Sequence, residues 1–136
     1  TMGPTYYNTF IEIAEDCPVS QAEIPQAKGG KKTKAVLEYE LIAKHPYKYT
    51  GEDIAFMAYA MHREIPKEHW DKERIKFFSQ DRPCLRASAL GKRYGWGTHH
   101  DAQGRVALVP VESKDYKQFV IAADLKHTKA MRSRKA

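Results

Sequence analysis

The stretch KRYGWGTHHDAQGRVALV (92–109) gives the clearest signal for the fold. Within it, DAQG (101–104) has Asp101 at the first position of a turn and Gly104, which can adopt a positive φ, at the last. This combination is typical of a type I turn followed by a G1 bulge, which joins two antiparallel strands. The stretch therefore predicts a β-hairpin.

The turn also sets how the two strands pair. With Asp101 facing Arg105, the expected pairs are His100–Val106, His99–Ala107, Thr98–Leu108, Gly97–Val109 and Trp96–Pro110. Successive side chains point to opposite faces of a strand. One face then carries Tyr94, Trp96, Thr98, His100, Val106 and Leu108, and the other carries Gly95, Gly97, His99, Ala107, Val109 and Val111.

The face with Gly95 and Gly97 has two interpretations. Glycine weakens a strand unless something approaches its backbone closely. A helix of the same chain packed on this face would account for both glycines. A ligand or another chain lying there, with Lys92 and Arg93 at the rim, would account for them equally well.

The same stretch supplies most of the candidate ligand-binding residues. Arginine and lysine neutralise phosphates, while tyrosine and tryptophan can stack on bases for roughly 1–3 kcal/mol each. This interleaving is typical of nucleic-acid binders and of pockets for small anions, but a core Trp96 beside surface arginines would produce the same pattern. The candidates are Arg86, Lys92, Arg93, Tyr94, Trp96, His99 and Arg105.

Three further patterns bear on catalysis and cofactors. His99 and His100 would point to opposite faces of a strand, so they do not readily chelate one ion, and we predict no metal. GGKKT (29–33) lacks the glycine spacing of a phosphate-binding loop, and we predict no cofactor. Cys84 opens an apolar segment, where cysteine acts more often as a small hydrophobe than as a nucleophile.

Strand and helix signals surround the hairpin. Alternation predicts a strand over 6–14, while prolines and glycines make 16–32 an irregular loop. Helix patterns follow over 35–44, 51–64 (capped by Thr50) and 67–79, then a strand over 83–90, the hairpin, and a last helix capped by Ser113. This order predicts an α+β domain: a mainly antiparallel sheet of about four strands, packed by about four helices.

Residues 35–44 (AVLEYELIAK) suit either a helix or a strand. Apolar residues alternate with Glu38 and Glu40, as in a strand, yet Ala, Leu and Glu all favour helices. We predict a helix that ends before His45-Pro46, because a residue that precedes proline disfavours the α region.

Length and composition indicate a single globular domain over 1–136. The chain has 42% hydrophobic and 29% charged residues, which is ordinary for such a domain. No run of about 18 apolar residues suits a membrane span, and TMGPTYYNTF (1–10) does not resemble a signal peptide. Cys17 and Cys84 are too few for a disulfide framework, so we expect a cytoplasmic protein. Because no membrane span is predicted, we expect no membrane partner.

The formal net charge of +6 favours anionic partners. Four lysines cluster between Lys28 and Lys34, and no acidic residue follows Asp124. Residues 126–136 therefore form a basic C-terminal tail, which we expect to be solvated and flexible unless it binds a polyanion.

Several strings together resemble a family of small uncharacterised bacterial and fungal proteins, defined only as a domain of unknown function. They are YYNTFIE (6–12), EDCP (15–18), HPYKYT (45–50), CLRAS (84–88), KRYGWG (92–97), GRVAL (104–108) and KAMRS (129–133). The resemblance covers nearly the whole chain and implies one compact domain. It implies no activity, ligand or catalytic residue.

Three functions fit these observations. The leading hypothesis is a binding protein for an anionic ligand, with nucleic acid among the candidates, because basic and aromatic residues interleave in the hairpin. A second is a small enzyme with a pocket beside the glycine face that uses Cys84, His99 or His100. A third is a protein–protein interaction domain that uses exposed aromatic residues.

Overall fold

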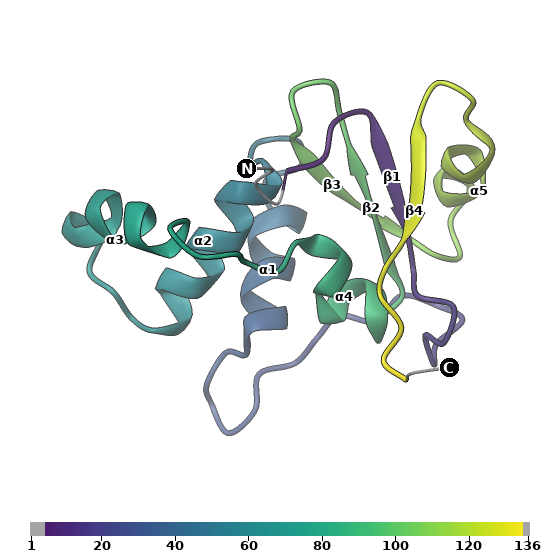
Figure 1. Ribbon diagram of the computed structural model, residues 1–136. Helices are drawn as coiled ribbons and strands as arrows, with labels where there is room; N and C mark the ends of the chain where they lie inside the picture. Colours follow the sequence, from purple (N-terminus) through teal and green to yellow (C-terminus); the bar gives the residue numbers. More distant parts are fainter. Residues whose placement is uncertain (1–4, 135–136) are drawn as a thin grey trace.

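A four-stranded sheet separates two layers of helices (Figure 1). The computed structural model describes residues 5–134. The strands are β1 (Thr9–Glu12), β2 (Trp96–His100), β3 (Val106–Pro110) and β4 (Lys126–Lys129), in the spatial order β3-β2-β1-β4. Strand β2 is antiparallel to both β1 and β3, whereas β4 is parallel to β1.

The helices lie on both faces of this sheet. They are α1 (Lys34–Ala43), α2 (Gly51–His62), α3 (Trp70–Phe77), α4 (Ala89–Lys92) and α5 (Lys114–Ile121), with short 3₁₀ helices η1 (Lys67–His69) and η2 (Leu85–Ala87). Helices α1, α2 and α4 lie on one side of the sheet, α5 lies on the other, and α3 projects away beyond α2 (Figure 1). None of the helices within residues 5–134 is both long enough and apolar enough to cross a membrane.

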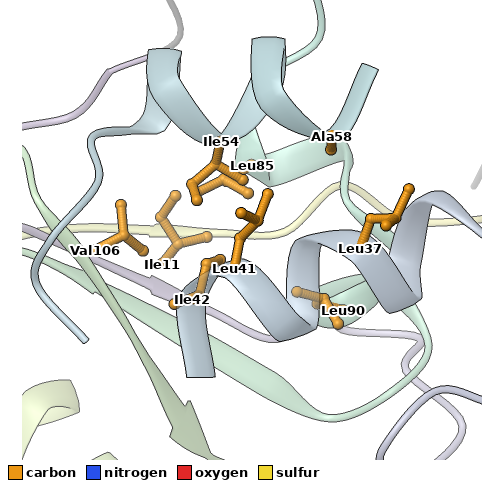
Figure 2. Close-up of a cluster of buried hydrophobic side chains, with 9 residues drawn as sticks. All are labelled: Ile11, Leu37, Leu41, Ile42, Ile54, Ala58, Leu85, Leu90 and Val106. Carbon is orange, nitrogen blue, oxygen red and sulfur yellow. The ribbon is translucent and has the colours of Figure 1, made fainter. Parts of the chain in front are cut away.

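The larger core lies between the sheet and the helices α1 and α2. Its side chains point toward one another from these elements, as Figure 2 shows. Full burial of one such aliphatic side chain contributes about 1.5–3 kcal/mol. The cluster consists of Ile11, Leu37, Leu41, Ile42, Ile54, Ala58, Leu85, Leu90 and Val106.

A smaller core lies under α5, on the opposite face. Phe10 packs against Tyr116 and Phe119, with ring centroids 5.1 and 5.2 Å away. The Tyr116 hydroxyl also accepts a hydrogen bond of 2.9 Å from the backbone N–H of Ile13. These contacts anchor α5 to β1.

The predicted helix starts have a clear local cause. Thr50 and Ser113 accept hydrogen bonds from the third backbone N–H beyond them, so both predicted caps are confirmed. At Thr50 the cap is reciprocal, because Asp53 accepts from the Thr50 N–H at 3.0 Å. The prediction of a helix over 35–44 is also confirmed, with Thr33 as its cap.

The hairpin forms as the sequence predicts. All five expected pairs from His100–Val106 to Trp96–Pro110 are present. Gly104 has φ +79°, and the Asp101 carboxylate accepts from the N–H groups of Gln103 and Arg105, each at 2.9 Å. The turn chemistry therefore determines the register.

The α+β class and the four-stranded sheet are confirmed, and two of the three strand pairings are antiparallel, whereas the β1–β4 pairing makes the sheet mixed. Five α-helices form within residues 5–134, where about four were predicted. The strand predicted over 83–90 is η2 followed by α4. Ser88 explains this difference, because its Oγ accepts from the Leu90 N–H at 3.1 Å and so caps α4.

Residues 126–134, the described part of the predicted basic tail, do not form a simple solvated tail. Lys126–Lys129 form strand β4, whose ends are tied by hydrogen bonds from the Lys126 N–H to the Asn8 carbonyl and from the Ala130 N–H to the Glu12 carbonyl. Ala130 is only 3% exposed. The lysines face solvent along a sheet edge, where they discourage pairing with other chains. Residues 135–136 lie outside the described residues.

Candidate functional site

A cavity of about 510 Å³ lies between α1, α2 and the segment 82–89, and we call it the Glu38 pocket. Its volume falls in the range of about 300–1,000 Å³ that is typical of small-molecule sites. It is lined by Lys34, Ala35, Glu38, Gly51, Ala55, Tyr59, Arg63, Phe77, Arg82, Pro83, Cys84, Leu85, Ala87, Ser88 and Ala89.

Small side chains create the space. Gly51, Ala55, Tyr59 and Arg63 lie four residues apart along α2, so they share one face of that helix. The first two are too small to fill the gap to the segment 82–89, which itself contributes alanines. The larger side chains of this face, Tyr59 and Arg63, lie farther along the helix.

The Glu38 carboxyl group is the buried polar group of the pocket, and Glu38 is 6% exposed. The Ser88 hydroxyl donates to its Oε1 at 2.7 Å. Because Ser88 Oγ already accepts from the Leu90 N–H, its hydrogen is directed to Glu38. Burial raises the pKa of Glu38, while the Ser88 hydrogen bond and the positive charge of Lys34 partly oppose that rise. Glu38 therefore holds a proton at a higher pH than an exposed glutamate.

Three cations line the same cavity: Lys34, Arg63 and Arg82, the three pocket cations. Within residues 5–134, no carboxylate lies within 4.0 Å of any of their charged nitrogen atoms. The Arg82 Nε donates to the Phe77 carbonyl at 2.6 Å, and its guanidinium lies 4.2 Å from the centroid of the Phe77 ring. Their positive charges are therefore available to an anion.

Tyr59 links the two arginines of this group. The Arg63 guanidinium lies 4.9 Å from the centroid of its ring and the Arg82 guanidinium lies 5.6 Å from it. Cation–π contacts of this kind hold a guanidinium in place while leaving its N–H groups free to donate. The two arginines are thus positioned before any ligand binds.

Cys84 also lines the pocket. Its Sγ lies 3.0 Å from the Tyr6 hydroxyl oxygen, at hydrogen-bond distance. Burial and the Cys84 hydrogen bond raise the pKa of Tyr6 to about 12, so this phenol stays protonated at neutral pH. The Cys84 thiol, the Ser88 hydroxyl and the Glu38 carboxyl group therefore line the same cavity as the three pocket cations.

The structure separates the residues that the sequence analysis grouped as ligand-binding candidates. Within residues 5–134, none of the seven lines the Glu38 pocket. The Arg86 Nε donates to the Lys129 carbonyl at 2.7 Å, next to β4. Lys92 ends α4, Arg93 follows it on the surface, and Arg105 is exposed beside the hairpin turn.

The rings of two aromatic candidates, Trp96 and His99, contact other parts of the same chain. The Trp96 Nε1–H donates to the Glu23 carbonyl at 2.8 Å, and its ring lies against Tyr39. The Tyr94 carbonyl accepts from the Glu23 N–H. The His99 ring stacks on Phe119 with centroids 4.3 Å apart. Its Nδ1 lies 2.8 Å from the Tyr47 hydroxyl.

The glycine face is filled by the same chain. A Cβ at Gly97 would lie 2.8 Å from Tyr116 of α5 and 3.0 Å from Phe10. Gly95, at φ +81°, would place a Cβ 2.9 Å from Val19. Of the two interpretations, helix packing therefore accounts for Gly97, and the loop around Val19 accounts for Gly95.

His100 is fully buried on the helix-covered face opposite α5. Its Nε2 lies 2.9 Å from the Thr98 hydroxyl, while Nδ1 has no hydrogen-bond partner among the described residues. Burial lowers its pKa to about 3, and it is neutral at physiological pH. Neither His99 nor His100 lies in the Glu38 pocket, so only Cys84 of the enzyme hypothesis does.

The sequence analysis missed Glu38, Ser88, Arg63 and Arg82. One signal for Glu38 was present, because the helix predicted over 35–44 places this carboxylate among Leu37, Leu41 and Ile42 on its apolar side. A charged residue within an apolar helix face is expensive to bury and is therefore informative. The others carry no comparable local signal.

Comparison with known proteins bears on this assignment. Residues 2–136 match the model of a family of unknown function, DUF6157. The chain belongs to this family. The resemblance to a family of uncharacterised proteins is thereby confirmed over nearly the whole chain. No curated protein and no solved structure matches it. In this DUF6157 member, the geometry of the Glu38 pocket is the feature that points to a function.

Proposed function

We propose that this domain binds a small organic ligand with an anionic group in the Glu38 pocket. The observation that carries the proposal is the presence of the three pocket cations around a concave site, with no carboxylate partner among the described residues. A partly buried cation such as Arg82 is normally paired, and the exposed Lys34 and Arg63 add positive charge to the same cavity, so an anion bound there would be attracted by all three.

The shape of the site favours a small molecule over a nucleic acid. A cavity of about 510 Å³ accepts a metabolite-sized ligand, whereas a duplex needs a broad basic surface. Arg93 and Arg105, the cations near the hairpin, are exposed, and neither of them lines the Glu38 pocket. A small carboxylate or phosphate compound is therefore the better match.

A titration followed by two-dimensional amide NMR tests this proposal. Sodium phosphate and sodium butyrate are added separately, against sodium chloride at the same ionic strength. We expect saturable shifts at Gly51, Ala55 and the segment 82–89. Arg63→Gln should weaken binding by about tenfold or more, because a charge-assisted hydrogen bond to an anion contributes about 1.5–3 kcal/mol.

Arg93→Gln is the matched control, since it removes an exposed arginine outside the pocket. It should leave the affinity of the pocket unchanged. Equal losses in Arg63→Gln and Arg93→Gln would contradict the proposal, as would shifts confined to residues 92–105. That second pattern would favour the candidates on the hairpin.

The position of Cys84 favours a second candidate function, an enzyme that uses a thiol. A nucleophile inside a ligand pocket can attack a bound substrate, and here its Sγ also contacts the Tyr6 hydroxyl. Iodoacetamide labelling read by mass spectrometry tests this candidate, with the half-buried Cys17 as the internal reference. We expect Cys84 to react faster than Cys17 and to be protected by phosphate. Slower labelling at Cys84 would exclude a reactive thiol.

A further inference from the structure

We propose that the ligand of the Glu38 pocket is a short zwitterion, whose ammonium group binds the Glu38 carboxylate while its anionic group binds the three pocket cations. The chemical class is a primary amine that also carries a carboxylate or a phosphate. This inference rests on the proposed function and adds the second charge of the ligand.

The charges of the pocket are separated by depth. Glu38 is 6% exposed, whereas Lys34 and Arg63 are exposed and Arg82 is half-buried. The ionisable carboxyl group therefore lies inside and the positive charges lie outside. A simple anion would satisfy only the outer part of this arrangement, whereas a zwitterion complements both parts.

The protein leaves the inner carboxyl group only partly satisfied. Within the described residues, its single hydrogen-bond partner is Ser88, although a carboxylate can accept about four hydrogen bonds. Lys34 lies one helical turn earlier on α1, yet it makes no ion pair with Glu38. An ammonium group supplies three donors and a compensating charge, whereas a hydroxyl group would supply a donor only.

Binding of an ammonium group should release a proton from Glu38. In the free protein, burial favours the protonated carboxyl group, and the ammonium favours the ionised one. Other charged or titratable groups face the same cavity: Lys34 from α1, Tyr59 and Arg63 from α2, and Arg82 and Cys84 from the segment 82–89. Of these groups and Glu38, only Glu38 is a carboxyl group, so a proton that a zwitterion releases in excess of its deaminated analogue is assigned to it.

A homologous series of amino acids serves as a molecular ruler. Glycine, β-alanine, 4-aminobutyrate, 5-aminovalerate and O-phosphoethanolamine are titrated by calorimetry, each beside its analogues without the amine and without the anionic group. We expect at least one zwitterion to bind about tenfold or more tightly than both of its analogues. The O-phosphoethanolamine arm distinguishes a phosphate ligand from a carboxylate ligand.

Two variants test whether Glu38 causes the tighter binding of the zwitterion. Glu38→Gln should reduce the affinity of the best zwitterion to that of its deaminated analogue, with no proton release in buffers of different ionisation enthalpy. Glu40→Gln is the matched control on the same helix, because Glu40 pairs with Lys32 at the surface. It should bind the zwitterion as the unmodified protein does.

The outcomes separate the two proposals. If the deaminated analogues bind as tightly as the zwitterions, the zwitterion proposal is wrong and the proposed function stands. If neither the zwitterions, nor butyrate, nor phosphate binds, both are wrong. Binding without proton release at every pH between 4.5 and neutrality in the unmodified protein would also overturn the zwitterion proposal, and this measurement needs no variant.

Discussion

Acidification should destabilise this protein in large part through one histidine. His100 is 0% exposed, and its pKa of about 3 in the folded protein lies well below the ordinary value of 6.5. Burial in an apolar environment is the main cause, and the positive charge of a protonated His99 adds to it. The Tyr6 ring packs against the His100 imidazole, with ring centroids 5.5 Å apart, and it offers no charge to compensate a proton on the imidazole.

The sign and size of the effect follow from these two pKa values. The folded state binds the proton less readily than the unfolded state, so the contribution of His100 to stability is complete above pH 6.5. It is lost as the pH falls from 6.5 toward 3. Because a pKa difference of one equals about 1.36 kcal/mol, the loss is about 3 kcal/mol at pH 4.5. A domain whose total stability is about 5–15 kcal/mol will show this clearly.

Urea denaturation at pH 7.5 and pH 4.5 measures this loss, with His100→Gln as the non-titrating variant. Gln can keep a polar atom near the Thr98 hydroxyl, and the free energy of unfolding should then change less with pH than in the unmodified protein. His62→Gln, an exposed histidine on α2, is the control and should behave as the unmodified protein does. The reasoning is refuted if His100→Gln loses as much stability as the unmodified protein, or if NMR shows the folded His100 ring titrating near 6.5.

Three further predictions concern stability. Gly97→Ala should cost roughly 1–3 kcal/mol, because its methyl group would meet the Tyr116 ring, and thermal denaturation checks this; an unchanged melting temperature would contradict the packing of α5 on this glycine. Glu38→Gln should stabilise the protein at pH 8 but not below pH 4.5. The pKa of Glu38 is raised in the folded protein, so the contribution of Glu38 to stability is lost as the pH rises. Urea denaturation at the two pH values tests this, and equal effects would argue against a buried ionisable group. Thr50→Ala should lower the free energy of unfolding by about 0.5–2 kcal/mol through loss of the α2 cap. An unchanged free energy in urea denaturation would show that Asp53 alone is enough to cap α2.

Local chemistry explains what could be predicted. The hairpin register depends on Asp101 and Gly104, which act within a four-residue turn. The starts of α2 and α5 depend on Thr50 and Ser113, each of which accepts from a residue three positions away. Such interactions involve near neighbours, so the residue types alone specify them.

The candidate site could not be predicted in this way, because its contacts join distant parts of the chain. Glu38 and Ser88 are 50 positions apart, and Tyr6 and Cys84 are 78 positions apart. The segment 83–90 has the apolar pattern of a strand, yet it forms η2 and the start of α4, which Ser88 caps. The seven candidates were grouped by closeness in sequence, whereas the structure distributes them over α4, the hairpin and the edge of β4.

The sequence by itself determined the α+β class, the hairpin with its register and faces, and the caps of two helices, because turns, caps and alternation are short-range effects. The tertiary structure decided the rest. It placed the basic C-terminal run beside β1 as a parallel edge strand and packed Tyr116 onto Gly97. It also placed around one cavity a buried carboxyl group and three cations that have no carboxylate partner within residues 5–134. These features depend on which surfaces meet when the chain folds, and burial of apolar area rather than local propensity selects them.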